Sequence, residues 1–273
     1  HRLVRKLLIR SSPTAEERGL TALQTALSGL ISQHQMVLRL EGPLDGRCRD
    51  WRGLREACAR GRPPPSTPEA FAELLDTKAF ASGADREAVK RYYSTAFQAA
   101  AEDCEQLVLA HLGWGDEEMR ALAEALPSFP RLRELFLEGN GVGDLGAEFL
   151  ARALPRCPNL KEVLLAGNRV GDAGAARLAE ALPKCLLVER LELRENRLGE
   201  AGAASLAGAL PQLRCLRDLL LQGNGLGDAG AEALAAALPS SRLERLVLDN
   251  TGIGAAGAAR LAEAVPRCAR LEL

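Results

Sequence analysis

The sequence predicts an α/β solenoid, in which short parallel strands alternate with helices. A strand-like segment recurs along the chain, and it ends in an asparagine every 28 residues: Asn140, Asn168, Asn196 and Asn224. Each copy is followed by a Gly-Asp start and by leucines spaced four residues apart, which is the pattern of a helix. One strand and one helix cannot bury their apolar faces alone, so similar units are expected to stack around one continuous core.

The strand half of the unit is clearest in residues 132–140 and returns at 160–168, 188–196 and 216–224. A weaker copy covers 104–112, and a sixth covers 243–251 after a one-residue deletion near Ser240. A seventh copy starts at Arg270. We therefore predict a repeat domain over residues 104–273, made of six units of 27–28 residues and the start of a seventh.

The second half of each unit predicts a helix with defined ends. Residues 141–146 (GVGDLG) and 225–230 (GLGDAG) are two of its starts, and the aspartate at the fourth place suits a helix amino terminus. We expect that capping to explain the whole row of Asp116, Asp144, Asp172, Glu200 and Asp228. A proline ends each helix: Pro127, Pro155, Pro183, Pro211, Pro239 and Pro266.

The asparagines are expected to be buried and to satisfy backbone groups of the turns, forming a ladder from unit to unit. Leu112 and Thr251 occupy the asparagine position at the two ends of the array. Cys157, Cys185 and Cys268 recur at another equivalent position, so we expect buried structural thiols there.

This pattern resembles the ribonuclease-inhibitor-like subfamily of leucine-rich repeat proteins over residues 104–273. The resemblance implies a horseshoe with parallel strands on the concave side and helices on the convex side. It also implies a protein that binds other proteins; the subfamily includes innate immune sensors and activators of small GTPases. The tryptophan and dense cysteine usage of the inhibitor itself is missing from this chain.

Residues 1–103 do not show the repeat clearly, and we predict a mainly helical cap there. A strand over 3–9, a helix over 12–31 and a strand over 36–40 are expected, belonging either to a degenerate repeat or to a small α/β piece. A proline-rich linker at 61–68 precedes predicted helices over 68–80 and 85–101. The second carries an apolar stripe expected to cover the first repeat, with a partner-binding helix as the alternative: Val89, Tyr92, Tyr93, Ala96 and Phe97.

Composition excludes several classes of function. The net charge of −1 argues against nucleic-acid binding, and the longest apolar runs are too short for a transmembrane segment. Seven cysteines without a CxxC pair, together with three histidines, predict neither a disulfide framework nor a metal site. We expect an intracellular, reducing compartment, either cytoplasmic or organellar, for a chain whose amino terminus looks incomplete.

No catalytic residue and no cofactor is predicted. Residues 141–146, 225–230 and 252–257 each match the dinucleotide-binding pattern GxGxxG. Three copies in one array indicate that the repeat needs tight turns and a close helix approach, rather than three cofactor sites. His111 is the single histidine of the repeat region and supports no catalytic assignment.

Alternate strand residues are expected to face the concave side. One exposed row is apolar in five of its six members, which indicates a protein-binding surface; the alternative is that β-formers merely fill an exposed sheet. The row is Val108, Phe136, Leu164, Glu192, Leu220 and Val247. We predict contacts by charged neighbours too: Glu134, Glu162, Arg190 and Arg194.

The predicted function is a non-enzymatic scaffold that binds a partner protein through this concave face. Two alternatives stay open. One is an accessory structural subunit of a large multi-protein assembly, for example an organellar or photosynthetic one. The other is a GTPase-activating regulator of a small GTPase.

Overall fold

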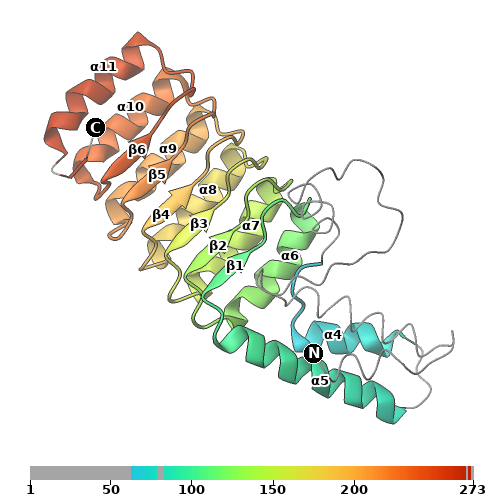
Figure 1. Ribbon diagram of the computed structural model, residues 1–273. Helices are drawn as coiled ribbons and strands as arrows, with labels where there is room; N and C mark the ends of the chain where they lie inside the picture. The colour runs from blue at the N-terminus through green and yellow to red at the C-terminus, as the bar shows by residue number, and fades with distance from the viewer. Residues whose placement is uncertain (1–62, 79–82, 269, 272–273) are drawn as a thin grey trace, which may run out of the picture.

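The computed structural model describes residues 63–78, 83–268 and 270–271. These form an α/β solenoid in which six strands make one sheet and six α-helices cover one of its faces (Figure 1). The predicted fold class is confirmed. The expected strand at 3–9, helix at 12–31 and strand at 36–40 lie outside the described residues.

The six strands are short, parallel and paired in sequence order, β1 to β6. Their bounds are Gln106–Val108, Glu134–Phe136, Glu162–Leu164, Arg190–Glu192, Asp218–Leu220 and Arg245–Val247. Equivalent residues of successive units are direct partners, such as Leu135 with Val163 and Leu219 with Leu246. The 28-residue period therefore places each repeat position in a straight row across the sheet.

The helices that cover the sheet start just after the asparagine turns. They are α6 (Asp116–Ala125), α7 (Asp144–Ala153), α8 (Asp172–Ala181), α9 (Glu200–Ala209), α10 (Gly227–Ala237) and α11 (Ala255–Ala264). Each continues into a 3-10 turn: η1 (Leu126–Ser128), η2 (Leu154–Arg156), η3 (Leu182–Lys184), η4 (Leu210–Gln212), η5 (Leu238–Ser240) and η6 (Val265–Arg267). The predicted proline is the second residue of each 3-10 turn. Because proline has no N–H to continue the α-helical bonding, the α-helix ends just before it.

The core lies between the sheet and the helices. The central leucine or valine of strands β2 to β5 is fully or almost fully buried, and so are the helix leucines that face it. The core runs through the repeats as a single cluster of buried side chains. Stacking thus supplies what one unit lacks, since each neighbour covers the apolar edge of the next.

In the part of the chain that the structure describes, two helices precede the first strand. Helix α4 (Pro68–Asp76) starts after a Thr67 cap, and α5 (Gly83–Glu102) packs beside it. Four aromatic rings connect these helices to the first repeat: Phe71 to Tyr93 at 4.0 Å, Tyr93 to Phe97 at 6.2 Å, and Phe97 to Phe129 at 5.8 Å between centroids. The apolar stripe predicted on α5 therefore faces inward and reaches the repeat core, although the expected helix over 68–80 already ends at Asp76.

Candidate protein-binding face

The predicted asparagine ladder is present and ties each repeat to the one before it, although Asn196 is half-buried whereas Asn140, Asn168 and Asn224 are buried. The Asn168 Nδ2 donates to the carbonyl of Leu137 in the preceding unit and to that of Leu165 in its own, both at 2.9 Å. Its Oδ1 accepts the backbone N–H of Val142 at 3.1 Å. Equivalent bonds are made by Asn140, Asn196 and Asn224. The ladder fixes the turns at the carboxyl ends of the strands.

The row of aspartates caps helices, but not in the way the sequence indicates. Asp144 Oδ1 accepts the backbone N–H of Gly171 at 2.7 Å and of Gly174 at 2.9 Å, so it caps the helix of the following repeat. The same pair of bonds joins Asp116, Asp172 and Asp228 to the next unit. The predicted helix-start capping is thus present for these four aspartates, but each lies in the first turn of its own helix and caps the next one. The stacked helices lie close enough for a short carboxylate to reach the neighbour's free N–H groups.

This contact explains the repeated GxGxxG pattern. A Cβ built on Gly146 would lie 2.6 Å from Asp116 Oδ1, and one built on Gly174 would lie 2.8 Å from Asp144 Oδ1. The helix amino terminus, where a dinucleotide phosphate would bind, is thus filled by the aspartate of the preceding unit. The glycines serve helix packing, as the sequence predicts.

One junction departs from this rule. Glu200 stands where the other units have aspartate, and α10 beyond it begins one residue earlier than its equivalents, at Gly227. Gly227 has a φ of +59°, and a Cβ there would lie 2.8 Å from Glu200 Oε1. Glu200 therefore occupies the aspartate's position in the row, as predicted. It does not make the aspartate's pair of capping bonds among the described contacts, because its side chain is longer and α10 begins one residue earlier.

The sheet surface opposite the helices, called here the concave face, carries the predicted row of apolar residues. The strand register places all six members of that row side by side: Val108, Phe136, Leu164, Glu192, Leu220 and Val247. Four of them are half-buried, but Leu164 is only 5% exposed and Glu192 only 8%. The expectation that the whole row is exposed is therefore wrong at the centre of the sheet, where neighbouring side chains cover it.

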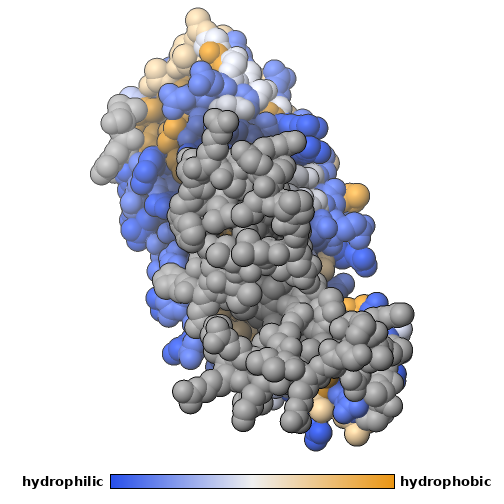
Figure 2. Space-filling view, turned by 45° about the vertical axis from the view of Figure 1, so that its right-hand side comes forward, coloured by the Kyte–Doolittle hydropathy of each residue, from blue (hydrophilic) through white to orange (hydrophobic). Residues whose placement is uncertain are grey.

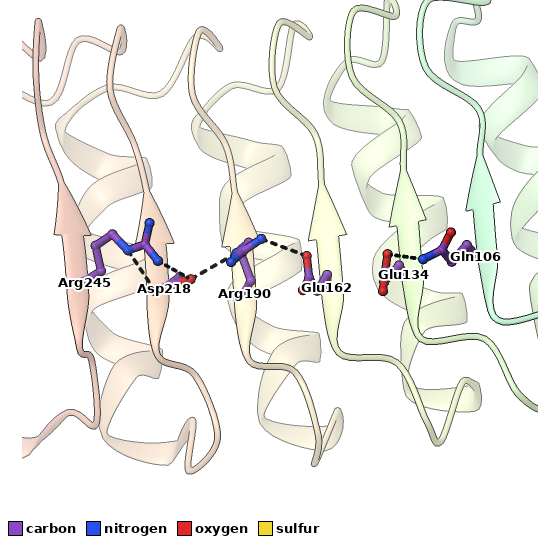
Figure 3. Close-up of polar contacts among 6 residues, drawn as sticks. All are labelled: Gln106, Glu134, Glu162, Arg190, Asp218 and Arg245. Carbon is purple, nitrogen blue, oxygen red and sulfur yellow. Dashed lines mark hydrogen bonds and ion pairs between the residues drawn. The ribbon is translucent and has the colours of Figure 1, made fainter.

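A second row on the concave face forms a chain of polar contacts (Figure 3). Arg190 lies 3.0 Å from Glu162 through Nη1 and 3.0 Å from Asp218 through Nε, and Arg245 lies 3.2 Å from the same aspartate. At the other end, Gln106 donates to Glu134 at 2.8 Å. No described cation pairs with Glu134, which faces Glu162 in the register. This row therefore has a balanced half over β3 to β6 and an acidic half over β1 and β2.

A third row follows the apolar row by two residues in each unit: Ala110, Glu138, Ala166, Arg194, Gln222 and Asp249. Two of its charged residues, Glu138 and Arg194, interact with the buried Glu192. Arg194 Nε lies 2.5 Å from Glu192 Oε1. Burial raises the pKa of Glu138, and the Glu192 carboxylate raises it further, whereas its own backbone N–H, His111 and Arg194 lower it. Ala166, between Glu138 and Arg194 in the register, is only 5% exposed. The four charged residues that the sequence predicts as contacts, Glu134, Glu162, Arg190 and Arg194, thus lie on or just after β2 to β4, whereas the apolar row spans all six strands.

The next position along each unit adopts a left-handed backbone. Glycine occupies it in three repeats, but His111, Glu195 and Asn250 have φ values of 58°, 53° and 54°. The His111 ring packs over Gly139, where a Cβ would lie 2.0 Å from Nδ1. A left-handed glutamate costs conformational energy, and sequence reasoning did not single out Glu195. Comparison with Gly139, Gly167 and Gly223 at the same repeat position was the signal that could have found it.

The predicted row of structural thiols is only partly buried. Cys157 is buried, whereas Cys185 and Cys268 are half-buried. Burial raises the pKa of both Cys157 and Cys185 to about 11. Since the thiolate is the reactive form, both groups are expected to be inert near neutral pH.

Within residues 63–78, 83–268 and 270–271, no three His, Cys, Asp or Glu side chains gather closely enough to hold a metal ion. Across the same part of the chain, no helix has the length and apolar content needed to cross a membrane. Figure 2 shows hydrophilic side chains over most of the described surface on that side, with paler and orange atoms gathered at the top, where Figure 1 places the sixth repeat.

Comparison with known proteins agrees with this architecture. The family model described as Leucine Rich repeat matches residues 131–151, 156–179 and 212–235. Together with the observed sheet and helices, this match identifies the described solenoid as one built from leucine-rich repeats. No curated protein matches the chain.

Several solved structures are similar in part. Actin-binding site 2 of leiomodin-1 matches at 16% identity and a TM-score of 0.42, covering 63% of this chain and 85% of that one. The tropomodulin carboxyl-terminal domain of Caenorhabditis elegans matches at 15% identity and a TM-score of 0.38, covering 63% and 89%. A pollen receptor kinase 3 matches at 26% identity and a TM-score of 0.31, covering 45% and 52%.

Proposed function

We propose that this protein is a non-catalytic scaffold that binds a partner protein through the concave face. The observation that carries the proposal is the register of the sheet. It aligns five apolar residues in one row, beside a row of charged side chains, on the surface that the helices leave open. An apolar strip with a charged border is the arrangement that protein interfaces use.

The charges favour one orientation of that partner. Glu134 and Glu162 lie together at the amino-terminal end of the array, and Arg190 and Arg245 lie toward the other end. A partner with a basic group over β2 would complement Glu134, whereas Arg190 and Arg245 are already paired with Glu162 and Asp218. Such complementarity favours specificity and the association rate more than affinity.

We also assign the repeats to the ribonuclease-inhibitor-like subfamily and the protein to a reducing compartment. The first assignment is supported by the 28-residue period and by a full helix of ten or eleven residues in every repeat. The second is supported by the cysteines at 104, 157, 185, 215 and 268, all of which carry free thiols.

The test replaces half-buried members of the apolar row and leaves its buried centre intact. The variant is Phe136→Glu, Leu220→Glu; Leu164 is kept because a charge at a 5% exposed position would disturb folding. Leu145→Glu is the matched control, because Leu145 is 60% exposed on α7, away from the sheet. Partners are captured from native extract, identified, and then titrated as purified proteins after thermal melts confirm folding.

The proposal predicts that the double variant lowers the affinity for a purified partner at least about tenfold, whereas Leu145→Glu leaves that affinity unchanged. If the double variant binds that partner as tightly as the unmodified protein does, the apolar row only fills the sheet and the proposal is wrong.

A further inference from the structure

Two neighbouring leucines are exposed near the amino-terminal ends of the strands, whereas the asparagine turns lie at the carboxyl ends. Leu186 is 75% exposed and Leu187 is 40% exposed, in the segment between η3 and β4. Only two other large apolar side chains of the described residues are exposed to this degree, Leu74 and Leu145, and they lie on separate helices. Single exposed leucines are ordinary, but an adjacent pair on one segment is less so.

The repeat fold does not require leucine at these two positions. The preceding unit has Pro158 and Asn159 there, and the following unit has Arg214 and Cys215. Asn159 even serves the stack, because its Nδ2 donates to the Pro130 carbonyl at 2.7 Å. Leu187 cannot make that bond. The fourth repeat thus loses a polar contact and exposes apolar surface at the same place.

Exposed cations flank the leucines on both sides. Arg156 and Lys184 end the 3-10 turns η2 and η3, and Arg214 lies in the next unit. None of these three cations has an ion-pair partner among the described residues. By contrast, nearby Lys161 is paired with Glu189 at 2.8 Å, and Arg217 lies 3.8 Å from Glu244. The three segments 155–161, 183–189 and 211–217 hold five cations and one carboxylate.

We propose that this surface, the basic edge (Arg156, Lys184, Leu186, Leu187 and Arg214), docks an acidic segment of a partner protein that carries apolar side chains. The leucines supply contact area, and the unpaired cations attract carboxylates and discriminate against basic segments. Neighbouring strands are about 4.8 Å apart, so three units span roughly 10 Å. An extended segment of about four to six residues is long enough to cover that width.

A protein segment fits this surface better than a membrane does. Recruitment to an anionic lipid surface by charge generally takes a cluster of about four to eight basic residues, and the basic edge offers three. The basic edge is separate from the concave face, which lies on the sheet surface, so the inference does not depend on the function proposed above.

The test is selection from a random peptide display library on the purified, immobilised full chain. One variant removes the apolar contact, Leu186→Ser, Leu187→Ser, with Leu145→Ser as its control. A second reverses charge, Lys184→Glu, Arg214→Glu. Its control is Arg169→Glu, Arg197→Glu, which makes the same charge change at exposed residues without ion-pair partners among the described residues, at the other end of the strands. Thermal melts establish that all four variants fold.

The expected result is enrichment of peptides with net negative charge and at least one large apolar residue. Their recovery should fall about tenfold on each basic-edge variant, stay unchanged on each control, and weaken as salt is raised from 0.05 to 0.5 M. Selected peptides without net negative charge, or equal recovery on all variants, would overturn the proposal. So would binding that appears only with vesicles of phosphatidylserine and phosphatidylcholine and depends on the leucines, because the edge would then contact lipid.

Discussion

The interior repeats and the sixth repeat have nearly the same sequence pattern but differ in how well their cores are covered. Leu193 and Leu221 are fully buried, whereas their equivalent in the sixth repeat, Leu248, is half-buried. The helix leucines differ in the same way: Leu178 and Leu234 are buried and Leu261 is not. The comparison teaches that the burial of these leucines depends on what packs beside each unit. In the first repeat, where no described repeat precedes, the equivalent Leu109 is still only 2% exposed.

The polar ladders show the same difference. Asn224 still joins the fifth repeat to the fourth through the Leu193 carbonyl, but among the described residues the Thr251 hydroxyl bonds only to the Leu248 carbonyl of its own unit, at 2.6 Å. The aspartate contact reaches one unit further, because Asp228 accepts from Gly254 and Gly257. The sixth repeat is therefore joined to the fifth by strand pairing and by the Asp228 cap, but no asparagine side chain bonds to it among the described residues.

The largest expected effect comes from truncating equivalent core leucines. Leu193→Ala should lower the free energy of unfolding by about 2–5 kcal/mol, because it leaves a cavity that both neighbours surround. Leu248→Ala should cost less than half as much, because its side chain is already partly accessible. Urea unfolding followed by circular dichroism measures both values, and equal costs would show that the sixth repeat is as well packed as the interior.

The asparagine ladder should give the next largest effect. Asn168→Ala removes hydrogen bonds to two repeats and leaves the buried Val142 N–H without its acceptor, so we expect a loss of about 2–3 kcal/mol. Thr251→Ala removes one bond and should cost about 1 kcal/mol. Amide hydrogen exchange measures where stability is lost. Exchange should become faster around residues 137–142 in the first variant and around 248–251 in the second. Uniform opening along the array would contradict a local ladder.

The inter-repeat helix cap should be worth less than the ladder. Asp172→Ala removes two bonds to the amino terminus of α9, and a lost cap costs about 1 kcal/mol. Glu200→Ala is the comparison, because that side chain makes no equivalent pair of bonds among the described contacts, and we expect a change under about 0.5 kcal/mol. The difference in urea midpoint between the two variants checks this, and a larger cost for Glu200→Ala would reverse the assignment.

The smallest effect concerns thiol chemistry. Because burial raises the pKa of Cys157 and Cys185 to about 11, these thiols are protonated at pH 8, and iodoacetamide should label them slowly. A pKa that is higher in the folded protein than the unfolded value near 8.5 contributes stability below that value. This contribution is lost as the pH rises toward 11.

Labelling rates read by mass spectrometry between pH 7 and 11 test these two thiols, with half-buried Cys268 of the sixth repeat as the comparison. Cys268 should react faster than Cys157, because its side chain is half-buried whereas that of Cys157 is buried. Fast labelling of Cys157 at pH 7 in the folded protein would mean that the first junctions open easily.

Much of this protein was determined by its sequence alone. The 28-residue period fixed the parallel strand order, the asparagine ladder, the helix ends and the membership of each concave-face row, because a repeat maps sequence position directly onto spatial position. Even the exposed pair Leu186 and Leu187 could have been found by comparing the same two positions across units. The structure of residues 1–62 is outside what is described, so the expectations made for them stay predictions.

Only the tertiary structure decided which groups meet across a junction and how far each row is covered. Asp144 reaches the next helix rather than its own, and Leu164 is buried although its strand position points away from the core. Both outcomes depend on distances of a few ångströms between stacked units and on the size of the neighbouring side chains. A repeat pattern records the residue types in each unit, but such distances arise only when the units pack together.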